Sequence, residues 1–405
     1  MRLKNTISEA HGAPLQEARS RLAVRRLTLT NFRNHAASRI EGIEAPLVVL
    51  TGPNGAGKTN VLEALSLLSP GRGLRRAAFA DMAIITAPEQ WAAAFSLSGL
   101  AGAVDIGMAW RASPRAANDD ATESPGSRTL KIDGRQARSA RDLARHVRLA
   151  WLTPAMDGLF TGPASDRRRF IDRLTLAVDP EHAGRISTLE KLLRQRNRLL
   201  ERHRAQGAWL GAIEAQLAGV AVAVAAARLM TVQAIAGGMR LLEAAHGAFP
   251  PAHLAMQGWL EERLLSSPAV EVEDAYRAHL AHSRTEDAAA GRTLVGAHRS
   301  DLVVTHAERG MPAKLCSTGE QKALLMALVL AHAQAVKDAL GGAAPILLLD
   351  EVAAHLDATR RQGLFDALLA LGAQVWMTGT DAAIFADLAG AATFFVIEDG
   401  QVRNG

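Results

Sequence analysis

A glycine-rich segment near residue 55 has the residue types and spacing of a phosphate-binding loop. It matches the P-loop pattern of Gly, four residues and Gly-Lys-Thr, with an apolar run before it and a helical pattern after it. The glycines let backbone N–H groups surround a phosphate at the positive end of that helix. We therefore expect ATP here, with Lys58 on the β- and γ-phosphates and the Thr59 hydroxyl on Mg²⁺. The expected ATP-binding residues of the loop are Gly52, Pro53, Asn54, Gly55, Ala56, Gly57, Lys58 and Thr59.

Two acidic residues far downstream fit the same chemistry. The apolar run Ile346–Leu349 ends in Asp350 and Glu351. A buried strand that ends in Asp is typical of the carboxylate that holds magnesium, so Thr59 and Asp350 are the predicted Mg²⁺ ligands. Glu351 is placed to orient or deprotonate the attacking water and is the predicted catalytic residue. Because acidic residues often end strands, the pattern indicates an ATPase only together with the P-loop.

A third polar segment, Ser317-Thr318-Gly319-Glu320-Gln321, lies about 30 residues before Asp350 and begins a long helical pattern. A serine and a glycine at a helix N-terminus offer donors to an anion. The alternative is an ordinary N-cap, in which Glu320 completes a capping box with Ser317. The spacing to Asp350 favours the anion site, because ABC-type ATPases carry their signature sequence at this position. The turn His355-Leu356-Asp357 after Glu351 matches the position of their D-loop.

Together these motifs resemble those of the ABC ATPase superfamily. The two Walker motifs lie about 290 residues apart, which is much wider than in transporter ATPases and is typical of the chromosome-organising and break-repair branch. Within that branch the chain is similar to the RecF family of bacterial recombination mediators, over roughly residues 23–400. The stretches that carry this similarity are Leu29–His35, Asn60–Leu65, Gly71–Arg75, Gly162–Pro163, Arg167–Asp172 and Gly296–Leu302.

The resemblance implies an α/β fold: an ABC-type ATPase head, with a P-loop α/β core and an antiparallel β subdomain, plus an inserted helical lobe. It implies an ATP-dependent homodimer that clamps DNA, and slow, DNA-stimulated ATP hydrolysis that acts as a timer. It also implies RecR and RecO as partners and RecA loading at gaps. The switch histidine of the repair-type enzymes is absent, and Thr378-Gly379-Thr380 stands in its place. The further residues that it implies at the nucleotide are Arg33, Asn34, Ser317, Gly319, Gln321 and Asp357.

The periodicity along the chain agrees with this organisation. We predict a loose extension over residues 1–22, a discontinuous ATPase domain over 23–175 and 291–405, and a helical lobe over 176–290 that is almost wholly helical. The polar stretch Ser113–Ser127 is a predicted flexible loop. The predicted strands are Ala23–Thr30, Leu47–Leu50, Trp91–Leu100, Ala103–Trp110, Arg128–Ile132, Ile346–Leu349 and Gln374–Met377, and the predicted helices are Glu190–Arg204, Ala212–Met230, Ser317–Val336 and Thr359–Leu371.

A compact arginine cluster, Arg167, Arg168 and Arg169, is the predicted DNA contact. Such clusters bind phosphates through charge, without base identity, and no aromatic residues interleave them to stack single-stranded bases. Duplex or junction DNA is therefore the expected partner. The alternative is a solvated helix face, with the charges offset by Asp166 and Asp172.

Composition sets the remaining limits. Lys and Arg number 46 against 41 Asp and Glu, and there is one cysteine, Cys316, which excludes an internal disulfide and a Cys-rich metal site. No apolar run approaches the roughly 20 residues that cross a bilayer, so we expect a cytoplasmic protein without a membrane partner. The alternatives to a recombination mediator are an architectural SMC-like DNA clamp, which would need a longer coiled coil, and an ABC transporter ATPase subunit.

Overall fold

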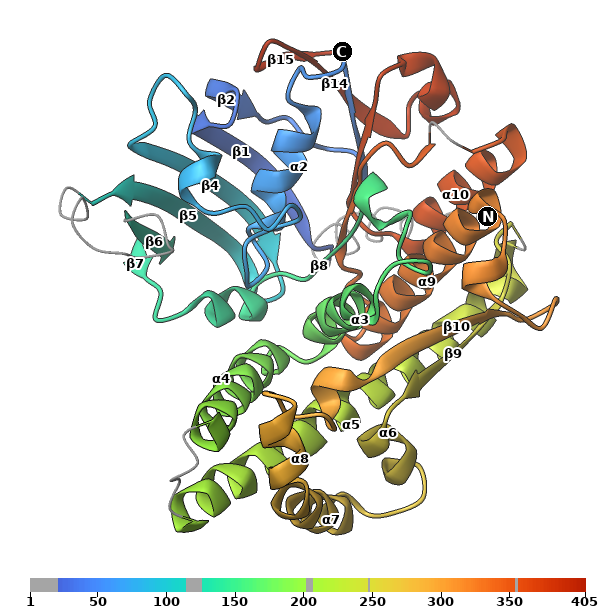
Figure 1. The fold of residues 1–405 in the computed structure, drawn as a ribbon. Helices are drawn as coiled ribbons and strands as arrows, with labels where there is room; N and C mark the ends of the chain where they lie inside the picture. Colours follow the sequence, from blue (N-terminus) through green and yellow to red (C-terminus); the bar gives the residue numbers. More distant parts are fainter. Residues whose placement is uncertain (1–20, 114–125, 202–206, 247, 354–355) are drawn as a thin grey trace, which may run out of the picture. The chain divides into compact units, whose positions relative to one another are not determined.

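The chain forms two compact units in the computed structural model, which describes residues 21–113, 126–201, 207–246, 248–353 and 356–405 (Figure 1). The first unit comprises residues 1–153 and 336–405, and the second comprises residues 154–335. The predicted boundaries at 175/176 and 290/291 differ from these because α3 (Ala164–Val178) packs on α5 (Gly207–His246) and on β10 (Asp301–His306), inside the second unit. The predicted extension 1–22 lies outside the described residues except at its last two positions.

A six-stranded sheet in the first unit carries the sequence motifs. Its strand order is β15-β14-β3-β13-β12-β8, and all neighbouring strands are parallel except β14 and β15. Every residue of β3, β12, β13 and β8 is buried, as expected for a sheet covered on both faces. The bounds are β3 Leu47–Thr51, β8 Leu149–Leu152, β12 Ile346–Leu349, β13 Val375–Gly379, β14 Ala392–Glu398 and β15 Gln401–Asn404.

The second sheet of this unit is antiparallel, with the order β2-β1-β4-β5-β6-β7. Its strands alternate between buried and more exposed positions, so one face carries the apolar core residues Trp91, Phe95 and Ile106. The α/β core with an antiparallel subdomain is thus confirmed, whereas the predicted loop Ser113–Ser127 lies mostly outside the described residues. The bounds are β1 Ala23–Phe32, β2 His35–Ile40, β4 Gln90–Gly99, β5 Gly102–Ala112, β6 Gly126–Ile132 and β7 Arg135–Gln136; the helices α2 Lys58–Ser66 and α10 Ala358–Leu371 also belong to this unit.

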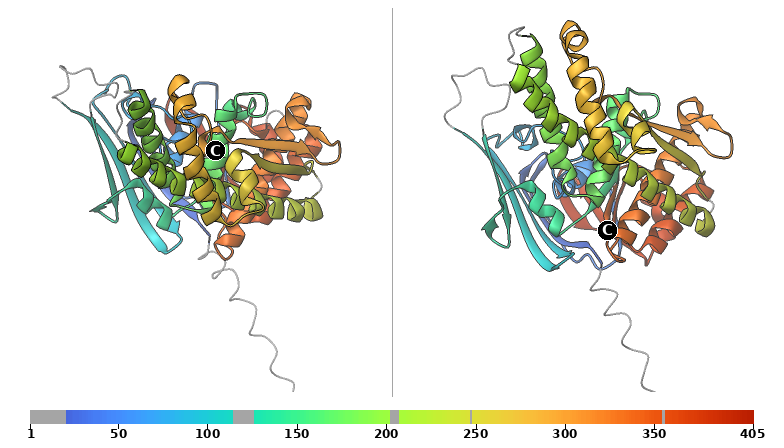
Figure 2. Two further views of the ribbon diagram at one scale, coloured as in Figure 1. Left: turned by 60° about the horizontal axis from the view of Figure 1, so that its bottom comes forward. Right: turned by 90° about the horizontal axis from the view of Figure 1, so that it is seen from below.

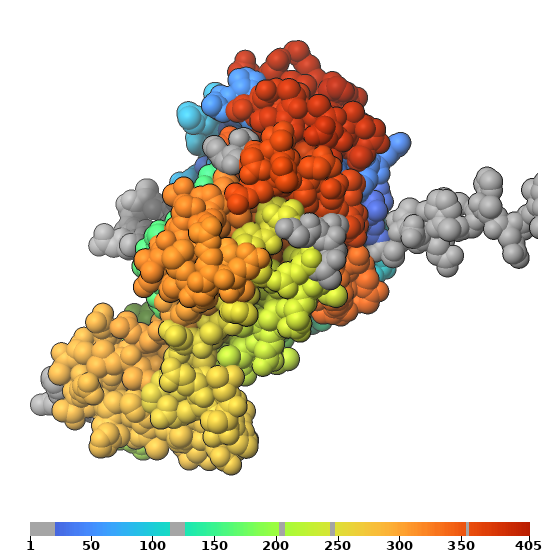
Figure 3. Space-filling view, turned by 90° about the vertical axis from the view of Figure 1, so that its right-hand side faces the viewer, coloured from blue at the N-terminus to red at the C-terminus, as the bar shows by residue number. Residues whose placement is uncertain are grey.

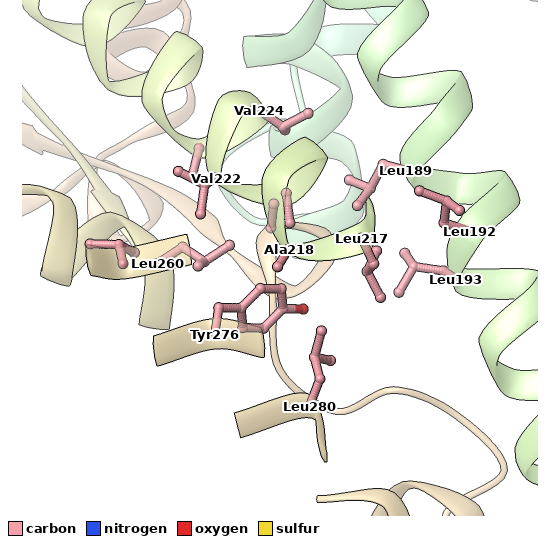
Figure 4. Packing of buried hydrophobic residues seen from close by; sticks show 14 of the residues in the cluster. Leu189, Leu192, Leu193, Leu217, Ala218, Val222, Val224, Leu260, Tyr276 and Leu280 are labelled. Atoms are coloured by element: carbon pink, nitrogen blue, oxygen red, sulfur yellow. The ribbon is translucent and has the colours of Figure 1, made fainter. Parts of the chain in front are cut away.

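The second unit is mainly helical. Helices α4 and α5 lie side by side (Figure 2) and pack with α7 around a core that includes Leu189, Leu217, Val224 and Tyr276 (Figure 4). Residues of α6 to α8 cover one end of the unit, drawn in yellow and light orange in Figure 3. The bounds are α4 His182–Glu201, α6 Trp259–Leu264, α7 Ala269–His282, α8 Arg284–Ala289 and α9 Thr318–Ala339, of which the residues up to 335 belong here.

A strand interrupts the stretch that was predicted to be almost wholly helical. Strand β9 (Ala252–Gln257) pairs antiparallel with β10 over its full length, and β10 in turn pairs with β11 (Met311–Pro312). The prediction was wrong here because Ala, Leu, Met and Gln favour helices locally, whereas the pairing partner of β9 lies more than 40 residues further along the chain.

Helix α5 is the one helix, among the residues that the structure describes, that is long and apolar enough to span a membrane. The most apolar 18-residue stretch of this helix is 56% buried. Its residues Leu217, Ala221 and Ala225 are fully buried in the core of the second unit. An apolar helix of this kind is typical of a protein core.

Candidate nucleotide-binding site

The P-loop lies between the buried strand β3 and helix α2, as its sequence predicts. Gly52 has φ +140, and a Cβ there would stand 2.1 Å from the Ile397 carbonyl oxygen. Gly57, the N-cap of α2, has φ +115, and a Cβ there would stand 2.6 Å from Asn34 Oδ1. Both positions therefore require glycine. The loop leads into the N-terminus of α2, the positive end of the helix, which is suited to an anion.

Two turns of the first unit form hydrogen bonds with the carbonyl groups of the P-loop. Asn34 Nδ2 donates to the Ala56 carbonyl at 2.8 Å, and the Gly400 N–H donates to the same oxygen at 3.0 Å. His35 is fully buried, and its Nε2 lies 3.1 Å from the Gly57 carbonyl oxygen. The turns after β1 and β14 thus fix the loop. Asn34 lies beneath the loop, and its direct contact with nucleotide stays a prediction.

His35 was not among the predicted site residues, although it belongs to the Leu29–His35 stretch that resembles the RecF family. Its Nδ1 lies 2.9 Å from both Ser38 Oγ and the Gly400 carbonyl oxygen. Burial lowers the pKa of the His35 imidazole, against the raising effect of the Gly57 and Gly400 carbonyls. Gly400 has φ +74, and a Cβ there would stand 2.1 Å from the Asn34 carbonyl oxygen, so this position also requires glycine.

Lys58 points into the loop. Its Nζ donates to the carbonyl oxygens of Gly52 and Pro53, at 2.7 and 2.8 Å. Desolvation lowers the pKa of this amine, and the nearby carboxylates of Glu351 and Asp350 oppose that shift. A cation held at the centre of the loop by weak carbonyl partners is suited to exchange them for phosphate oxygens.

Arg33 is engaged by the protein itself. Its guanidinium binds the fully buried Glu63 of α2 with two hydrogen bonds, of 2.7 and 2.8 Å, and donates to the Asp81 carbonyl. Arg75 donates to the same Glu63 carboxylate at 3.1 Å. Arg33 therefore ties the β1–β2 turn to the P-loop helix, and its predicted contact with nucleotide stays a prediction.

The two Walker motifs meet across 291 residues of sequence. Thr59 Oγ1 donates to Asp350 Oδ1 at 2.9 Å, because β13 alone separates β3 from β12 and parallel strands end at the same sheet edge. Because the Thr59 hydroxyl donates its hydrogen bond to Asp350, the lone pairs of its oxygen remain available to a cation. Among the described residues no cluster of three or more His, Cys, Asp or Glu could hold a metal. One hydroxyl and one carboxylate fit Mg²⁺, which takes its other ligands from phosphates and water.

Glu351 follows Asp350 in an unusual backbone conformation. Its φ is +51, and its N–H donates to Thr378 Oγ1 at 2.9 Å. The Thr378 hydroxyl in turn donates to Asp350 Oδ1 at 2.8 Å. Thr378 was not among the predicted site residues. The only signal in the sequence was the Thr378-Gly379-Thr380 segment in the place of the switch histidine.

The predicted signature segment begins helix α9 in the second unit. Glu320 Oε2 accepts hydrogen bonds from the N–H and the hydroxyl of Ser317, both at 2.9 Å, and these bonds lower the pKa of Glu320. Gln321 Nε2 donates to the Cys316 carbonyl at 2.8 Å. The N-cap alternative is therefore present in the structure. The roles of Ser317, Gly319 and Gln321 toward a nucleotide stay predictions.

The predicted D-loop residue Asp357 is the N-cap of α10, and its carboxylate accepts from the Arg360 N–H at 2.8 Å. Its neighbour His355 lies outside the described residues. A role of Asp357 at the nucleotide stays a prediction.

The arginine cluster on α3 is divided between two environments. Arg167 binds both carboxylate oxygens of Asp301, at 2.7 and 2.8 Å, and donates to the Gly162 carbonyl at 2.6 Å. Arg168 donates to the Ser300 carbonyl at 2.7 Å. Arg169 pairs with Asp166 on the helix surface, where its side chain is 50% exposed. Arg167 and Arg168 thus hold α3 against the start of β10, and Arg169 is the most exposed of the three. A contact of this cluster with DNA stays a prediction.

Comparisons with known proteins agree with the fold and the motifs. The family model described as RecF/RecN/SMC N terminal domain matches residues 23–401. The chain is 49% identical to the DNA replication and repair protein RecF of Rhizobium meliloti (strain 1021), over 94% of this chain and 98% of that protein. It is 50% identical to the protein of the same name from Mesorhizobium japonicum, over 94% and 97%.

Among solved structures, the recombination mediator protein RecF with ATP in the RecFOR pathway has the same fold. Its TM-score is 0.80, at 21% identity over 95% of this chain and 98% of that one. The curated relatives are similar enough, over nearly their whole length, to decide the family. The chain therefore belongs to the RecF family.

Proposed function

We propose that the protein is an ATP-dependent, DNA-binding recombination mediator. The observation that carries this proposal is the hydrogen bond between Thr59 and Asp350, which joins a P-loop and a Walker B strand from opposite ends of the chain. Membership of the RecF family supports the DNA-repair role, since the curated relatives are named for replication and repair.

The proposed nucleotide site uses the first unit as its base. The P-loop N–H groups and Lys58 would hold the phosphates of ATP, and Thr59 with Asp350 would hold Mg²⁺. The metal would supply positive charge to the β- and γ-phosphate oxygens. Glu351 would orient or deprotonate the attacking water.

The proposed site is completed by a second copy of the chain. Ser317 and Gly319 of one protomer would contact the γ-phosphate held by the P-loop of the other, so ATP would join the two. The resulting dimer would clamp duplex or junction DNA, and slow, DNA-stimulated hydrolysis would time its release. RecR and RecO as partners are supported by the name of the pathway in which the related RecF structure is placed. RecA loading at gaps is the outcome that we propose for this clamp.

Light scattering and DNA binding in parallel test this function. The purified protein is measured with ATP, ADP or no nucleotide, with duplex DNA and over a salt series. We expect the dimer and tight DNA binding with ATP but not with ADP or without nucleotide. The affinity for DNA should fall as the salt concentration rises, because phosphate contacts release counterions. A protein that stays monomeric with ATP and binds no DNA would contradict the proposal.

A further inference from the structure

A single hydroxyl group links the two acidic residues of the Walker B segment. Thr378 Oγ1 lies 2.8 Å from Asp350 Oδ1 and 2.9 Å from the Glu351 backbone nitrogen. We propose that Thr378 is a positioning residue for ATP hydrolysis, which holds the metal-binding carboxylate and the catalytic glutamate in one fixed arrangement. This inference rests on the proposed ATPase function.

The position of Thr378 follows from the sheet. In the register of β13, Met377 stands opposite Leu349 of β12 and Thr378 stands opposite Leu50 of β3. Thr378 therefore lies at the level where β12 ends and Asp350 begins. Thr378 is only 1% exposed, so water does not compete for the hydrogen bonds of its hydroxyl group.

The chemistry requires a hydroxyl at this position. Thr378 acts as donor to the Asp350 carboxylate and as acceptor from the Glu351 N–H, and only a group with both capacities can do this. Asp350 Oδ1 then accepts two hydroxyl hydrogens, one from Thr59 in the first turn of α2 and one from Thr378 near the end of β13. These two bonds fix the orientation of the carboxylate before a cation arrives.

The backbone of Glu351 depends on the same hydroxyl. A φ of +51 is a left-handed conformation that a glutamate seldom adopts. Such a conformation persists where surrounding contacts determine it, and the bond from the Glu351 N–H to Thr378 is a contact of this kind. Because the backbone sets the direction of the side chain, Thr378 also determines where the Glu351 carboxylate points.

The test compares Thr378→Val, which keeps the shape and loses the hydroxyl, with Thr378→Ser, which keeps the hydroxyl. Thr175→Val is the matched control, because Thr175 is also fully buried but bonds a helix carbonyl in the second unit. Melting temperature, binding of a fluorescent ATP analogue with and without Mg²⁺, and single-turnover hydrolysis are measured for each variant.

We expect Thr378→Val to slow hydrolysis about tenfold or more, as for a displaced general base, and to raise the Mg²⁺ concentration at half-maximal binding. Analogue binding without Mg²⁺ should be unchanged. Thr378→Ser should restore both properties, and Thr175→Val should change neither. If Thr378→Val does not fold, Thr378→Ala, which is smaller and also lacks the hydroxyl, makes the same comparison with Thr378→Ser.

A double variant separates positioning from general damage. At saturating Mg²⁺ the weaker metal binding is compensated, and Thr378 then affects the rate only through Glu351. Glu351→Gln with Thr378→Val should therefore hydrolyse ATP no more slowly than Glu351→Gln alone under this condition. A wild-type rate and Mg²⁺ dependence in Thr378→Val, or fully additive losses in the double variant, would overturn the positioning role. Failure of the wild-type protein to bind or hydrolyse ATP would instead contradict the proposed function.

Discussion

Replacing Arg167 and Arg169 separately distinguishes a structural arginine from a DNA contact. The side chain of Arg167 is 15% exposed, and Arg167→Ala removes two hydrogen bonds to Asp301 and three to the carbonyl groups of Leu159, Phe160 and Gly162. Charged hydrogen bonds contribute roughly 1.5–3 kcal/mol when buried, and partial exposure of both partners reduces this value. We expect a loss of about 2 kcal/mol in the free energy of unfolding.

That loss corresponds to a melting temperature lower by roughly 4–8 °C for a unit of this size. Arg169→Ala should change the melting temperature by less than about 2 °C, because surface pairs contribute little. It should instead lower the slope of log affinity against log salt by up to about 0.9, the value for one phosphate contact. Differential scanning fluorimetry and fluorescence anisotropy with labelled duplex DNA measure the two effects.

Asp301→Ala is the matched variant for Arg167→Ala, since it breaks the same pair from the other side and removes no positive charge. If Arg167 is structural, both variants should lose stability, and Arg167→Ala should lose more because it also removes the hydrogen bonds to three carbonyl groups. The reasoning would be refuted if Arg167→Ala melted like the wild type while its salt slope fell, or if Arg169→Ala destabilised the protein with DNA binding intact.

Three further results follow from the site and from one buried histidine. Lys58→Met should abolish ATP-dependent dimerisation, because the P-loop loses its cation; unchanged dimerisation by light scattering would show that the loop is not the ATP site. Glu351→Gln should reduce ATPase activity by about tenfold or more while prolonging the ATP-bound dimer on size-exclusion chromatography, whereas Asp350→Asn should lose metal and stable dimer together. Burial lowers the pKa of His332 to about 4, so the unfolded state binds its proton first as pH falls from 6.5, and stability should drop by roughly 3 kcal/mol by pH 4. Urea unfolding of His332→Gln, which should lack that part of the pH dependence, tests the last result.

The local parts of the fold were predictable from the sequence. Strands β3 and β12 are continuous apolar runs. The P-loop between β3 and α2 is a contiguous pattern, and its glycines adopt positive φ angles that other residues rarely adopt. Strand β9 was not predictable in this way, since its residues favour a helix and only pairing with β10 makes it a strand. The unit boundary at 153/154 was missed for the same reason, because it depends on the packing of α3.

The site shows the same division between local and long-range information. Lys58, Thr59, Asp350 and Glu351 stand in motifs whose spacing reveals them. Arg167 was assigned to DNA from its charge alone, whereas its partner Asp301 lies 134 residues away in sequence. A charged side chain in a cluster gives no local sign of whether its partner is a protein carboxylate or a phosphate.

The P-loop depends on residues that no single motif contains. Its Ala56 carbonyl accepts from Asn34, near the start of the described chain, and from Gly400, near the end. Strand β3, which leads into it, pairs with β13 and β14 from the C-terminal part. The loop therefore acquires its supported conformation only when both ends of the chain have assembled into the first unit. This explains why a helical unit of 154–335 can be inserted between the Walker motifs: the contacts that join Thr59 to Asp350 are made by the sheet and do not depend on the length of the connection.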